Sequence, residues 1–321
     1  MQSVLVAGGA GFIGSHLCEE LLNEGYRVFC VDNLITGDKK NIDAFLNNSN
    51  FKFVELDIVQ NFSALDSQFP ILDYIFHLAS PASPNKKSPR SYINYPLETL
   101  MANSVGTRNL LELAKKTKAK FLFASTSEIY GDPLISPQNE EYFGNVNPNG
   151  IRSVYDEAKR FGEAITMAYV RKFDLDARIV RIFNTYGPKM QKDDGRVVSN
   201  FIIQAINNLN ITIYGNGNQT RSFCFINDMI KGLSLAMFTE NTKGEVINLG
   251  NPDERRVSEL ATIIKELTKS SSSISEESLP DDDPKLRNPD INKAKKVLGW
   301  EPTIKLEEGL EKTIEYFKSI N

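Results

Sequence analysis

Five short apolar runs in the first half of the chain limit its fold more than any other feature. They do not alternate with polar residues, which is typical of strands buried on both faces of a parallel sheet. Segments with helical spacing lie between them, and this alternation predicts an α/β fold with a doubly wound, Rossmann-type parallel sheet. The expected strands are Val4–Ala7, Arg27–Val31, Phe51–Glu55, Tyr74–Leu78 and Lys120–Ala124, and the expected helices are Ser15–Asn23, Asn103–Lys116 and Val154–Lys172.

The second half is less regular and predicts a smaller C-terminal α/β domain. Its expected elements are helices at Val197–Asn207, Val257–Thr268 and Glu307–Lys318, and a strand at Ile211–Tyr214. We place the boundary near residue 185, so that residues 1–185 form the first domain and residues 186–321 mainly the second, with later segments returning to the first. The acidic run Asp281–Asp283 could hold a cation, but we favour a solvated loop.

Charge and composition exclude several classes of protein. The net charge is −4, whereas a nucleic-acid-binding protein shows a concentrated positive excess. No apolar run approaches the ~18 residues of a membrane span, and the start Met1–Ser3 lacks the cationic segment of a secretory signal. The scattered cysteines Cys18, Cys30 and Cys224 suit a reducing compartment. We therefore expect a cytoplasmic protein that binds neither nucleic acid nor membranes.

A glycine-rich turn follows the first expected strand and opens the first expected helix. Gly8, Gly11 and Gly14 allow a tight turn and a close approach of backbone to a pyrophosphate, and the helix N-terminus offers N–H groups to phosphates. Asp32 ends the second expected strand, 18 residues after Gly14. There its carboxylate can accept hydrogen bonds from an adenosine ribose and repel a 2′-phosphate. These residues predict NAD, in preference to NADP, as the cofactor.

Tyr155 and Lys159 lie one helical turn apart, so both side chains project from one face of an expected helix. A tyrosine with its ordinary pKa of ~10 is a poor base at neutral pH. A lysine ammonium and a positively charged nicotinamide ring both favour the phenolate, and lowering the pKa by roughly 3 units corresponds to about 4 kcal/mol. The pair predicts an activated tyrosine beside the cofactor.

The segment Ser125–Gly131 follows the fifth expected strand, at the edge of the sheet where ligands bind. Together with the glycine turn, Tyr155 and Lys159, it resembles the extended short-chain dehydrogenases/reductases that act on nucleotide sugars. Longer stretches resemble the UDP-glucuronate decarboxylases, also called UDP-xylose synthases, over nearly the whole chain. These stretches are His77–Pro84, Ser125–Pro133, Phe183–Pro188, Asp194–Phe201, Gln219–Phe223 and Asp282–Trp300.

The resemblance implies an NAD-dependent decarboxylase that converts UDP-glucuronate to UDP-xylose through a UDP-4-keto intermediate, without a metal. It also implies an NAD-binding first domain, a nucleotide-sugar-binding second domain, and a homodimer in which the helices Asn103–Lys116 and Val154–Lys172 pair across a two-fold axis. By the family's pattern, Thr126 hydrogen-bonds the 4-oxygen of the sugar beside Tyr155. The implied catalytic residues are Thr126, Glu128, Tyr155 and Lys159.

Further residues are implied at the two ligands by the same resemblance. The substrate is expected to contact Ser127, Asn184, Arg196, Tyr214, Arg221 and Arg287, of which the last two match the family's phosphate-binding arginines. The cofactor is expected to contact Gly8, Gly11, Phe12, Ile13, Gly14, Asp32, Asn33, Thr36, Gly37, Asp57, Ile58, Leu78, Ala79, Ser80, Tyr155, Lys159 and Thr185.

Glu128 separates the decarboxylase from its alternatives. By the family's pattern, 4,6-dehydratases have Asp-Glu at this pair and 4-epimerases have small residues, whereas this chain has Ser127-Glu128. Glu128 could repel the substrate carboxylate or protonate C5 through water, and the sequence leaves both roles open. Further alternatives are a decarboxylase that releases the 4-keto pentose and a catalytically silent NAD-binding scaffold. The scaffold would be expected to lack one of Thr126, Tyr155 and Lys159.

One segment departs from the family pattern. Asn85–Ser91 is a few residues longer than the usual loop and follows a stretch near the expected sugar pocket. Its Lys86, Lys87 and Arg90 could attract an anionic nucleotide sugar, and Pro89 limits regular structure. We interpret it either as an ordinary exposed loop or as a mobile lid over the site.

Overall fold

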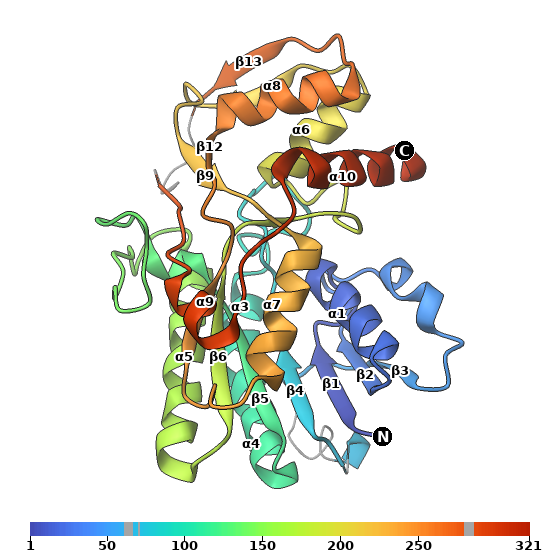
Figure 1. Ribbon diagram of the computed structural model, residues 1–321, viewed down its shortest axis with the longest axis vertical. Coiled ribbons are helices and arrows are strands. Elements are labelled where there is room, and N and C mark those ends of the chain that lie inside the picture. The colour runs from blue at the N-terminus through green and yellow to red at the C-terminus, as the bar shows by residue number, and fades with distance from the viewer. Residues whose placement is uncertain (61–66, 70, 279–285) are drawn as a thin grey trace.

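The computed structural model describes residues 1–60, 67–69, 71–278 and 286–321. Within these residues the central sheet has seven strands, all parallel, in the order β11-β6-β5-β4-β1-β2-β3 (Figure 1). All five strands expected from the first half are present, which confirms the predicted doubly wound parallel sheet. The strands are β1 (Ser3–Ala7), β2 (Arg27–Asp32), β3 (Phe51–Glu55), β4 (Tyr74–His77), β5 (Lys120–Thr126), β6 (Ala177–Ile182) and β11 (Val246–Leu249).

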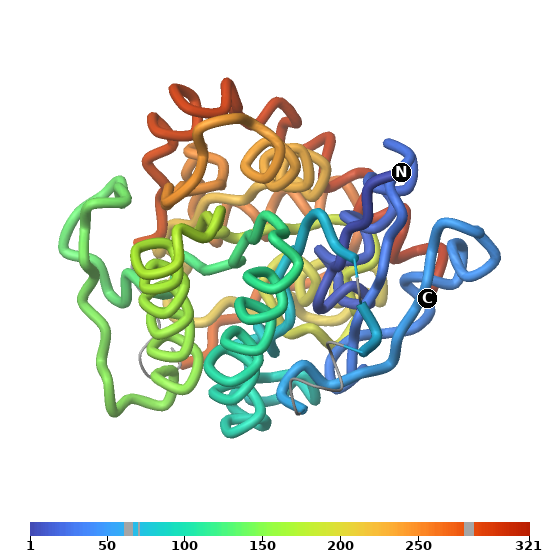
Figure 2. The backbone as a smooth tube through the Cα atoms, turned by 90° about the horizontal axis from the view of Figure 1, so that it is seen from below, coloured from blue at the N-terminus to red at the C-terminus, as the bar shows by residue number. Residues whose placement is uncertain are grey.

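Helices cover both faces of the sheet, α1 (Phe12–Asn23) and α7 (Ile226–Phe238) on one side and α4 (Thr107–Thr117) and α5 (Ser153–Phe173) on the other (Figure 2). Successive residues of β1 face opposite layers because side chains alternate along a strand. Val4 and Val6 belong to the core cluster that includes α1 and α7, and Leu5 and Ala7 belong to the cluster that includes α4 and α5. Burial on both faces explains why the apolar runs do not alternate with polar residues.

The helix expected at Asn103–Lys116 begins earlier and is interrupted. It consists of α3 (Pro96–Met101), a single π turn over 102–106 and then α4. The turn lies where the backbone comes close to its neighbours, because a β-carbon at Gly106 would lie 2.6 Å from Cδ1 of Ile58. Within it, Nδ2 of Asn103 donates to the hydroxyl of Ser80 at 2.8 Å. The irregular turn therefore supports the segment that follows β4.

The C-terminal part forms a separate layer, seen at the top of Figure 1. Three helices pack together there, α6 (Val197–Ile206), α8 (Val257–Thr268) and α10 (Leu306–Ile320). Short strands pair in twos: β8 (Ile211–Tyr214) with β13 (Ile274–Glu277), β9 (Thr220–Ser222) with β12 (Glu254–Arg256), and β7 (Thr185–Tyr186) with β10 (Cys224–Phe225). Helix α9 (Asn292–Leu298) follows later in the described part of the chain.

The chain passes more than once between the two parts. Both α7 and β11 follow residue 185 in the sequence, yet α7 covers the central sheet and β11 pairs with β6 at its edge. The boundary between domains stays a prediction, and the acidic run Asp281–Asp283 lies outside the described residues. No helix in the described part of the chain is long and apolar enough to cross a membrane.

Candidate active site

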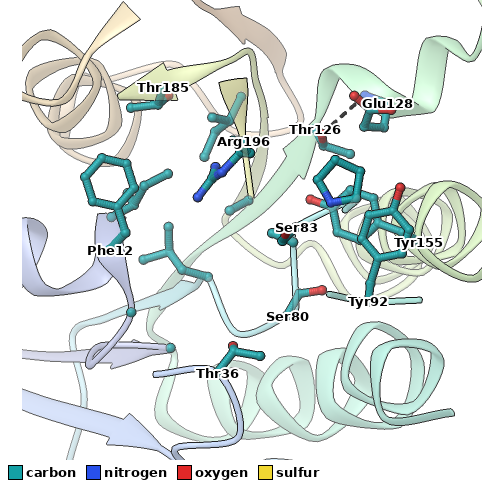
Figure 3. Close-up of a pocket in the computed structure, with 18 of the residues that line it drawn as sticks. Phe12, Thr36, Ser80, Ser83, Tyr92, Thr126, Glu128, Tyr155, Thr185 and Arg196 are labelled. Atoms are coloured by element: carbon teal, nitrogen blue, oxygen red, sulfur yellow. Dashed lines mark hydrogen bonds between the residues drawn. The ribbon is translucent and has the colours of Figure 1, made fainter. Parts of the chain in front are cut away.

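Most of the predicted site residues line one pocket at the carboxyl end of the central sheet (Figure 3). Ligands of open parallel sheets bind at this edge, because the loops that follow the strands meet there. Residues predicted for the cofactor and for the sugar share this pocket, so the two ligands would lie next to each other. The predicted residues that line it are Gly8, Gly11, Phe12, Ile13, Gly14, Thr36, Leu78, Ser80, Thr126, Ser127, Glu128, Tyr155, Lys159, Asn184, Thr185 and Arg196.

The glycine turn after β1 forms a cradle of bare backbone. Gly8 has a positive φ of 81°, and a β-carbon there would lie 2.7 Å from the amide nitrogen of Ala79. A β-carbon at Gly14 would lie 2.1 Å from the carbonyl oxygen of Gly8, so only glycine fits. Helix α1 begins at once, and its N-cap residue Gly11 supplies no side-chain cap. The first N–H groups of α1 are therefore available to a phosphate, which fits the pyrophosphate of a dinucleotide.

Asp32 lies at the end of β2 and is buried. Its two carboxylate oxygens accept hydrogen bonds from the backbone N–H groups of Ala10, at 3.0 Å, and Leu34, at 2.8 Å. Burial raises the pKa of Asp32, and these two hydrogen bonds oppose the rise. A β-carbon at Gly37 would lie 2.7 Å from the Asp32 carboxylate, so Gly37 leaves room beside it.

Several residues predicted for the cofactor do not line the pocket. They are Asp32, Asn33, Gly37, Asp57, Ile58 and Ala79. Asn33 and Asp57 hydrogen-bond each other at 3.1 Å, and so join the ends of β2 and β3. The backbone of Ala79 lies close to Gly8, and the side chain of Ile58 packs against Gly106 in the π turn. These contacts shape the loops around the pocket, and the predicted contacts with the cofactor stay predictions.

Thr126 and Tyr155 meet at the centre of the pocket. Thr126 ends β5 and Tyr155 lies in the first turn of α5, and their hydroxyl groups are hydrogen-bonded. The Thr126 hydroxyl also accepts from the N–H of Glu128 at 3.2 Å, the contact drawn as a dashed line in Figure 3. Burial raises the pKa of Tyr155 above its usual range, although the bond to Thr126 opposes this. The side chains of the protein alone therefore do not produce the phenolate.

Lys159 lies one turn after Tyr155 and is almost completely buried. Its ammonium donates to the carbonyl oxygen of Ala124 at 2.8 Å and lies 5.8 Å from the centre of the Tyr155 ring. Burial lowers the pKa of Lys159 to about 7, although the charge of Glu163 opposes this. The sequence predicts a full positive charge on this lysine, whereas its charge at neutral pH is only partial because burial disfavours the ammonium.

Glu128 is held between two arginines. It lies in the short 3₁₀ helix η4 (Ser127–Tyr130), directly after β5. Arg152 donates to its carboxylate, and Nη2 of Arg287 forms an ion pair with the same oxygen at 3.3 Å. Burial opposes ionisation of Glu128, but the charges of Arg152 and Arg287 outweigh it and lower the pKa of Glu128 to about 2. Glu128 is therefore an anion at neutral pH.

Three residues predicted for the substrate do not line the pocket: Tyr214, Arg221 and Arg287. Arg287 is buried, and its Nη1 donates to the carbonyl oxygens of Ser127 and Gly131 at 2.8 and 3.2 Å. Arg221 lies in β9 and donates to the carbonyl of Thr220 at 2.8 Å. Arg287 thus contacts mainly Glu128 and the backbone beside it. Phosphate binding by Arg221 and Arg287 stays a prediction.

Arg196 points into the pocket between Phe12 and Thr126 (Figure 3). Its guanidinium donates twice to Asp194, at 2.5 and 2.7 Å, and lies 5.9 Å from the centre of the Phe12 ring. A bidentate pair of this kind fixes the arginine in one orientation. Thr185 has its hydroxyl bonded to the carbonyl of Phe183 at 2.9 Å. Within the described residues no three His, Cys, Asp or Glu side chains are grouped as a metal site.

The sequence analysis missed several residues that line the pocket. Tyr92 is buried, and its ring stacks on that of Tyr155 with the centres 4.8 Å apart and the planes at 4°. Nothing in the sequence indicates this stack. Arg152 precedes Tyr155 by three residues, so a helical spacing could have pointed to it. Asp194 also lines the pocket, as does Arg90, which the sequence singled out only as a charge on the loop Asn85–Ser91.

Comparison with known proteins connects this pocket to a family. The model of the NAD dependent epimerase/dehydratase family matches residues 4–250. The chain is 47% identical over 317 residues to UDP-glucuronic acid decarboxylase 1 of Xenopus tropicalis, covering 99% of this chain and 72% of that protein. It is 48% identical over 316 residues to UDP-glucuronic acid decarboxylase 6 of Arabidopsis thaliana, covering 98% of this chain and 88% of that protein.

Solved structures show the same fold. UDP-glucuronic acid 4-epimerase from Bacillus cereus, in complex with UDP-glucuronic acid and NAD, superposes with a TM-score of 0.88 at 31% identity and full coverage of both chains. UDP-glucose 4-epimerase from Thermotoga maritima, with UDP-glucose, gives a TM-score of 0.89 at 31% identity, with 99% of each chain covered. The predicted cofactor, NAD, is confirmed at the level of the family. The match over most of its length shows that this chain belongs to the NAD dependent epimerase/dehydratase family.

Proposed function

We propose that the chain decarboxylates UDP-glucuronate to UDP-xylose through a UDP-4-keto intermediate. The relatives named as UDP-glucuronic acid decarboxylases match almost the whole chain, and the chain covers more than two thirds of each of them. The observation that carries the proposal is the carboxylate of Glu128, held ionised by Arg152 and Arg287 beside Thr126 and Tyr155. In this proposal the dinucleotide lies along the glycine turn and the sugar beside Thr126.

The proposed reaction begins at the hydroxyl of the sugar's C4. Tyr155 accepts the proton of this hydroxyl, and Thr126 holds the sugar's 4-oxygen beside it. NAD, when bound along the glycine turn, would supply the hydride acceptor for C4 and, in its reduced form, the hydride for the final reduction. The Lys159 ammonium lies close enough to Tyr155 to favour the phenolate, and its low pKa makes proton exchange with it feasible near neutral pH. The result is a ketone at C4.

A ketone at C4 is β to the C6 carboxylate, so the bond between C5 and C6 can break with its electrons delocalised into the carbonyl. Carbon dioxide leaves, and the hydroxyls of Thr126 and Tyr155 stabilise the enolate oxygen by hydrogen bonding. Protonation at C5 and reduction at C4 then give the pentose. The low pKa of Glu128 disfavours it as the proton donor, so we assign it an electrostatic role toward the carboxylate.

The charges around Glu128 suit an anionic sugar. Glu128 carries one negative charge, and Arg152 and Arg287 carry one positive charge each. Burial and the neighbouring charge of Glu128 raise the pKa of Asp156 to about 8, so Asp156 is neutral at pH 7. The cluster therefore has a net charge of +1. The positive net charge of the cluster can attract the substrate carboxylate. The negative charge of Glu128 would then lie close to that carboxylate.

The direct test is to incubate the protein and NAD with UDP-glucuronate, and to measure released carbon dioxide and the mass of the nucleotide-sugar product. UDP-xylose and one carbon dioxide per substrate are expected. A product of unchanged mass would instead indicate a 4-epimerase, and loss of water from a UDP-hexose substrate would indicate a 4,6-dehydratase. A 4-keto pentose released together with NADH would identify a decarboxylase that does not complete the reduction.

Asp156 gives the proposed reaction a pH dependence. Above its pKa of about 8, Asp156 loses its proton and the cluster becomes neutral, which weakens its hold on the sugar carboxylate. We expect the KM for UDP-glucuronate to rise about tenfold between roughly pH 7 and pH 9, and this rise to be absent in Asp156→Asn. Steady-state kinetics at each pH measure the KM. Titration of Lys159 affects the unaltered protein and Asp156→Asn equally, so the comparison isolates Asp156. The same rise in Asp156→Asn would assign it to another group.

Asp32 is expected to determine the choice of dinucleotide. Its carboxylate would repel a 2′-phosphate, so the unaltered protein should bind NAD at least about tenfold more tightly than NADP. Asp32→Asn keeps the shape of the side chain and removes its charge, so it should reduce the difference in affinity between NAD and NADP. Fluorescence titration with the two reduced dinucleotides measures both dissociation constants. Equal or tighter binding of the phosphorylated form by the unaltered protein would contradict the assignment.

We further propose a homodimer formed by the outer faces of α3, α4 and α5. Large apolar side chains lie exposed there, with Leu97 69% exposed on α3 and Phe161 49% exposed on α5. Light scattering at micromolar concentration should give twice the mass of the chain, and Phe161→Glu should shift it toward one chain by placing a charge in the interface. Leu209→Glu, on an exposed turn after α6, is the control and should stay dimeric. A single-chain mass for the unaltered protein would refute the dimer.

We also propose that the protein works in a reducing compartment such as the cytoplasm. All three cysteines, Cys18, Cys30 and Cys224, are buried and free of disulfide bonds. A hydrogen bond with Cys18, together with burial, raises the pKa of the Cys30 thiol, and burial raises the pKa of the Cys224 thiol. Thiols with a raised pKa are poorly reactive. Fractionation of the source cells, followed by detection of the protein, tests this location.

A further inference from the structure

The long loop Asn85–Ser91, which the sequence predicts to be either an exposed loop or a mobile lid, is joined by hydrogen bonds at its base and in its interior. Its base is closed by a bridge between Ser83 and Ser91, and by the N–H of Tyr92 donating to the carbonyl of Ser83 at 3.0 Å. Its interior is braced by Asn94, whose Nδ2 donates to the carbonyls of Ser88 and Lys86 at 2.8 and 3.1 Å. The backbone carbonyls of Lys86 and Ser88 inside the loop thus have a hydrogen-bond donor in Asn94.

The same loop is joined to the segment that leads into α6. Two of its side chains, and that of Ser83 just before it, donate to three consecutive backbone carbonyls of residues 193–195. The close approach requires glycine, because a β-carbon at Gly195 would lie 2.7 Å from Cβ of Asn85. The donors and carbonyls are Ser88 to Asp193 at 2.5 Å, Ser83 to Asp194, and Asn85 to Gly195 at 3.2 Å.

Arg90 extends this connection across the pocket. Its Nη1 donates to the carbonyl of Thr36 at 2.8 Å, and its Nε pairs with the carboxylate of Asp193 at 3.2 Å. Gln191 donates to the same carbonyl of Thr36 at 3.4 Å. Thr36 follows β2 and Asp32, on the side predicted for the adenosine of the dinucleotide. Arg90, Thr36 and Gln191 all line the pocket, so the bridge spans its wall.

We infer that Arg90 is a positioning residue that fastens loop Asn85–Ser91 as a clasp over the adenosine side of the dinucleotide and slows its exchange. For the dinucleotide to leave, the segment at Thr36 has to separate from residues 193–195. Arg90 is the charged side chain that joins both, and hydrogen bonds from a charged donor are the stronger kind. The inference rests on the dinucleotide site of the proposed function. It adds a reason for the extra length of this loop.

The experiment measures how fast bound NADH leaves. The protein is loaded with NADH and mixed rapidly with excess NAD, and the loss of NADH fluorescence gives the dissociation rate. Arg90→Ala should raise this rate about tenfold, because both bridges are lost. Arg90→Lys should raise it less, about threefold, because one ammonium cannot reproduce the fork that reaches Thr36 and Asp193 together. Lys86→Ala, which removes an exposed charge from the same loop, should leave the rate unchanged.

Two results would overturn the clasp. One is a dissociation rate for Arg90→Ala, or for Arg90→Lys if the alanine variant does not fold, within about twofold of the unaltered protein. The other is an equal acceleration by Lys86→Ala, which would assign the effect to the charge of the loop. The measurement needs no sugar, so it stays informative if UDP-glucuronate is not the substrate. Conversely, failure of the clasp leaves production of UDP-xylose by the unaltered protein untouched.

Discussion

Replacing Tyr155 with phenylalanine is expected to suppress both NADH formation and carbon dioxide release by at least ~10²–10⁴-fold, the usual contribution of a general base. The phenol oxygen is the group that takes the C4 proton, and its hydrogen bond to Thr126 places it at the sugar's 4-oxygen in the proposed reaction. Oxidation comes first, so decarboxylation cannot proceed without it. Single-turnover mixing of UDP-glucuronate with the NAD-loaded protein measures both products.

Tyr169→Phe is the matched control for this substitution. Tyr169 lies on the same helix, and its hydroxyl donates to Glu112 at 2.5 Å, outside the residues that line the pocket. It should form NADH at the rate of the unaltered protein. The binding of NAD should be the same in all three proteins. NADH formation by Tyr155→Phe within about tenfold of the unaltered rate would remove Tyr155 from the proton transfer.

Glu128→Gln is expected to separate the steps that follow. The variant should form NADH within about tenfold of the unaltered rate but complete conversion to UDP-xylose about 10²-fold more slowly. The substitution raises the net charge of the cluster with Arg152 and Arg287 from +1 to +2, so the sugar carboxylate is held more strongly and leaves less readily. Single-turnover time courses of NADH, carbon dioxide and UDP-xylose measure the three steps in one experiment.

Loss of the carboxylate also breaks its ion pairs with two buried guanidinium groups, and breaking a buried pair typically costs about 3–5 kcal/mol of folding stability. Asp176→Asn is the control for this effect, because Asp176 is the carboxylate partner of the buried Arg178 at the far end of β6. Asp176→Asn should lower the folding stability without changing the relative rates of NADH formation and conversion to UDP-xylose. If Glu128→Gln blocks NADH formation as severely as Tyr155→Phe, Glu128 belongs to the oxidation and the assignment is wrong.

The first half of the fold could be predicted because its strands are plain apolar runs, whereas β6 could not. Its sequence, Ala-Arg-Ile-Val-Arg-Ile, places two arginines in a strand that is buried on both faces. Arg178 donates to Asp176 and to Thr242, and Arg181 forms a bidentate pair with Glu163. Thr242 is 64 residues from Arg178 and Glu163 is 18 residues from Arg181, and such partners make these charges tolerable in the core. Local pattern alone cannot identify them.

The same limit applies to the pocket. The glycine turn and the pair Tyr155 and Lys159 are local motifs, whose geometry follows from one turn and one helix. The sequence could single out Glu128, but could not show that Arg152 and Arg287 hold it, because Arg287 is 159 residues away. The stack of Tyr92 on Tyr155 has the same origin. The charged side chains that contact one another in the pocket come from segments far apart in the sequence, so the tertiary fold decides which of them pair.

Arg287 also limits how this protein can be recombined with its relatives. By sequence it belongs to the last part of the chain, yet its contacts are with the carboxylate and carbonyls directly after β5. A chimera that joined residues 1–185 to the C-terminal part of an epimerase would have to supply a guanidinium at this place. Without one, Glu128 would lose one of the two arginines that pair with it. We therefore expect that a chimera designed to change the substrate would have to exchange Glu128 together with Arg287.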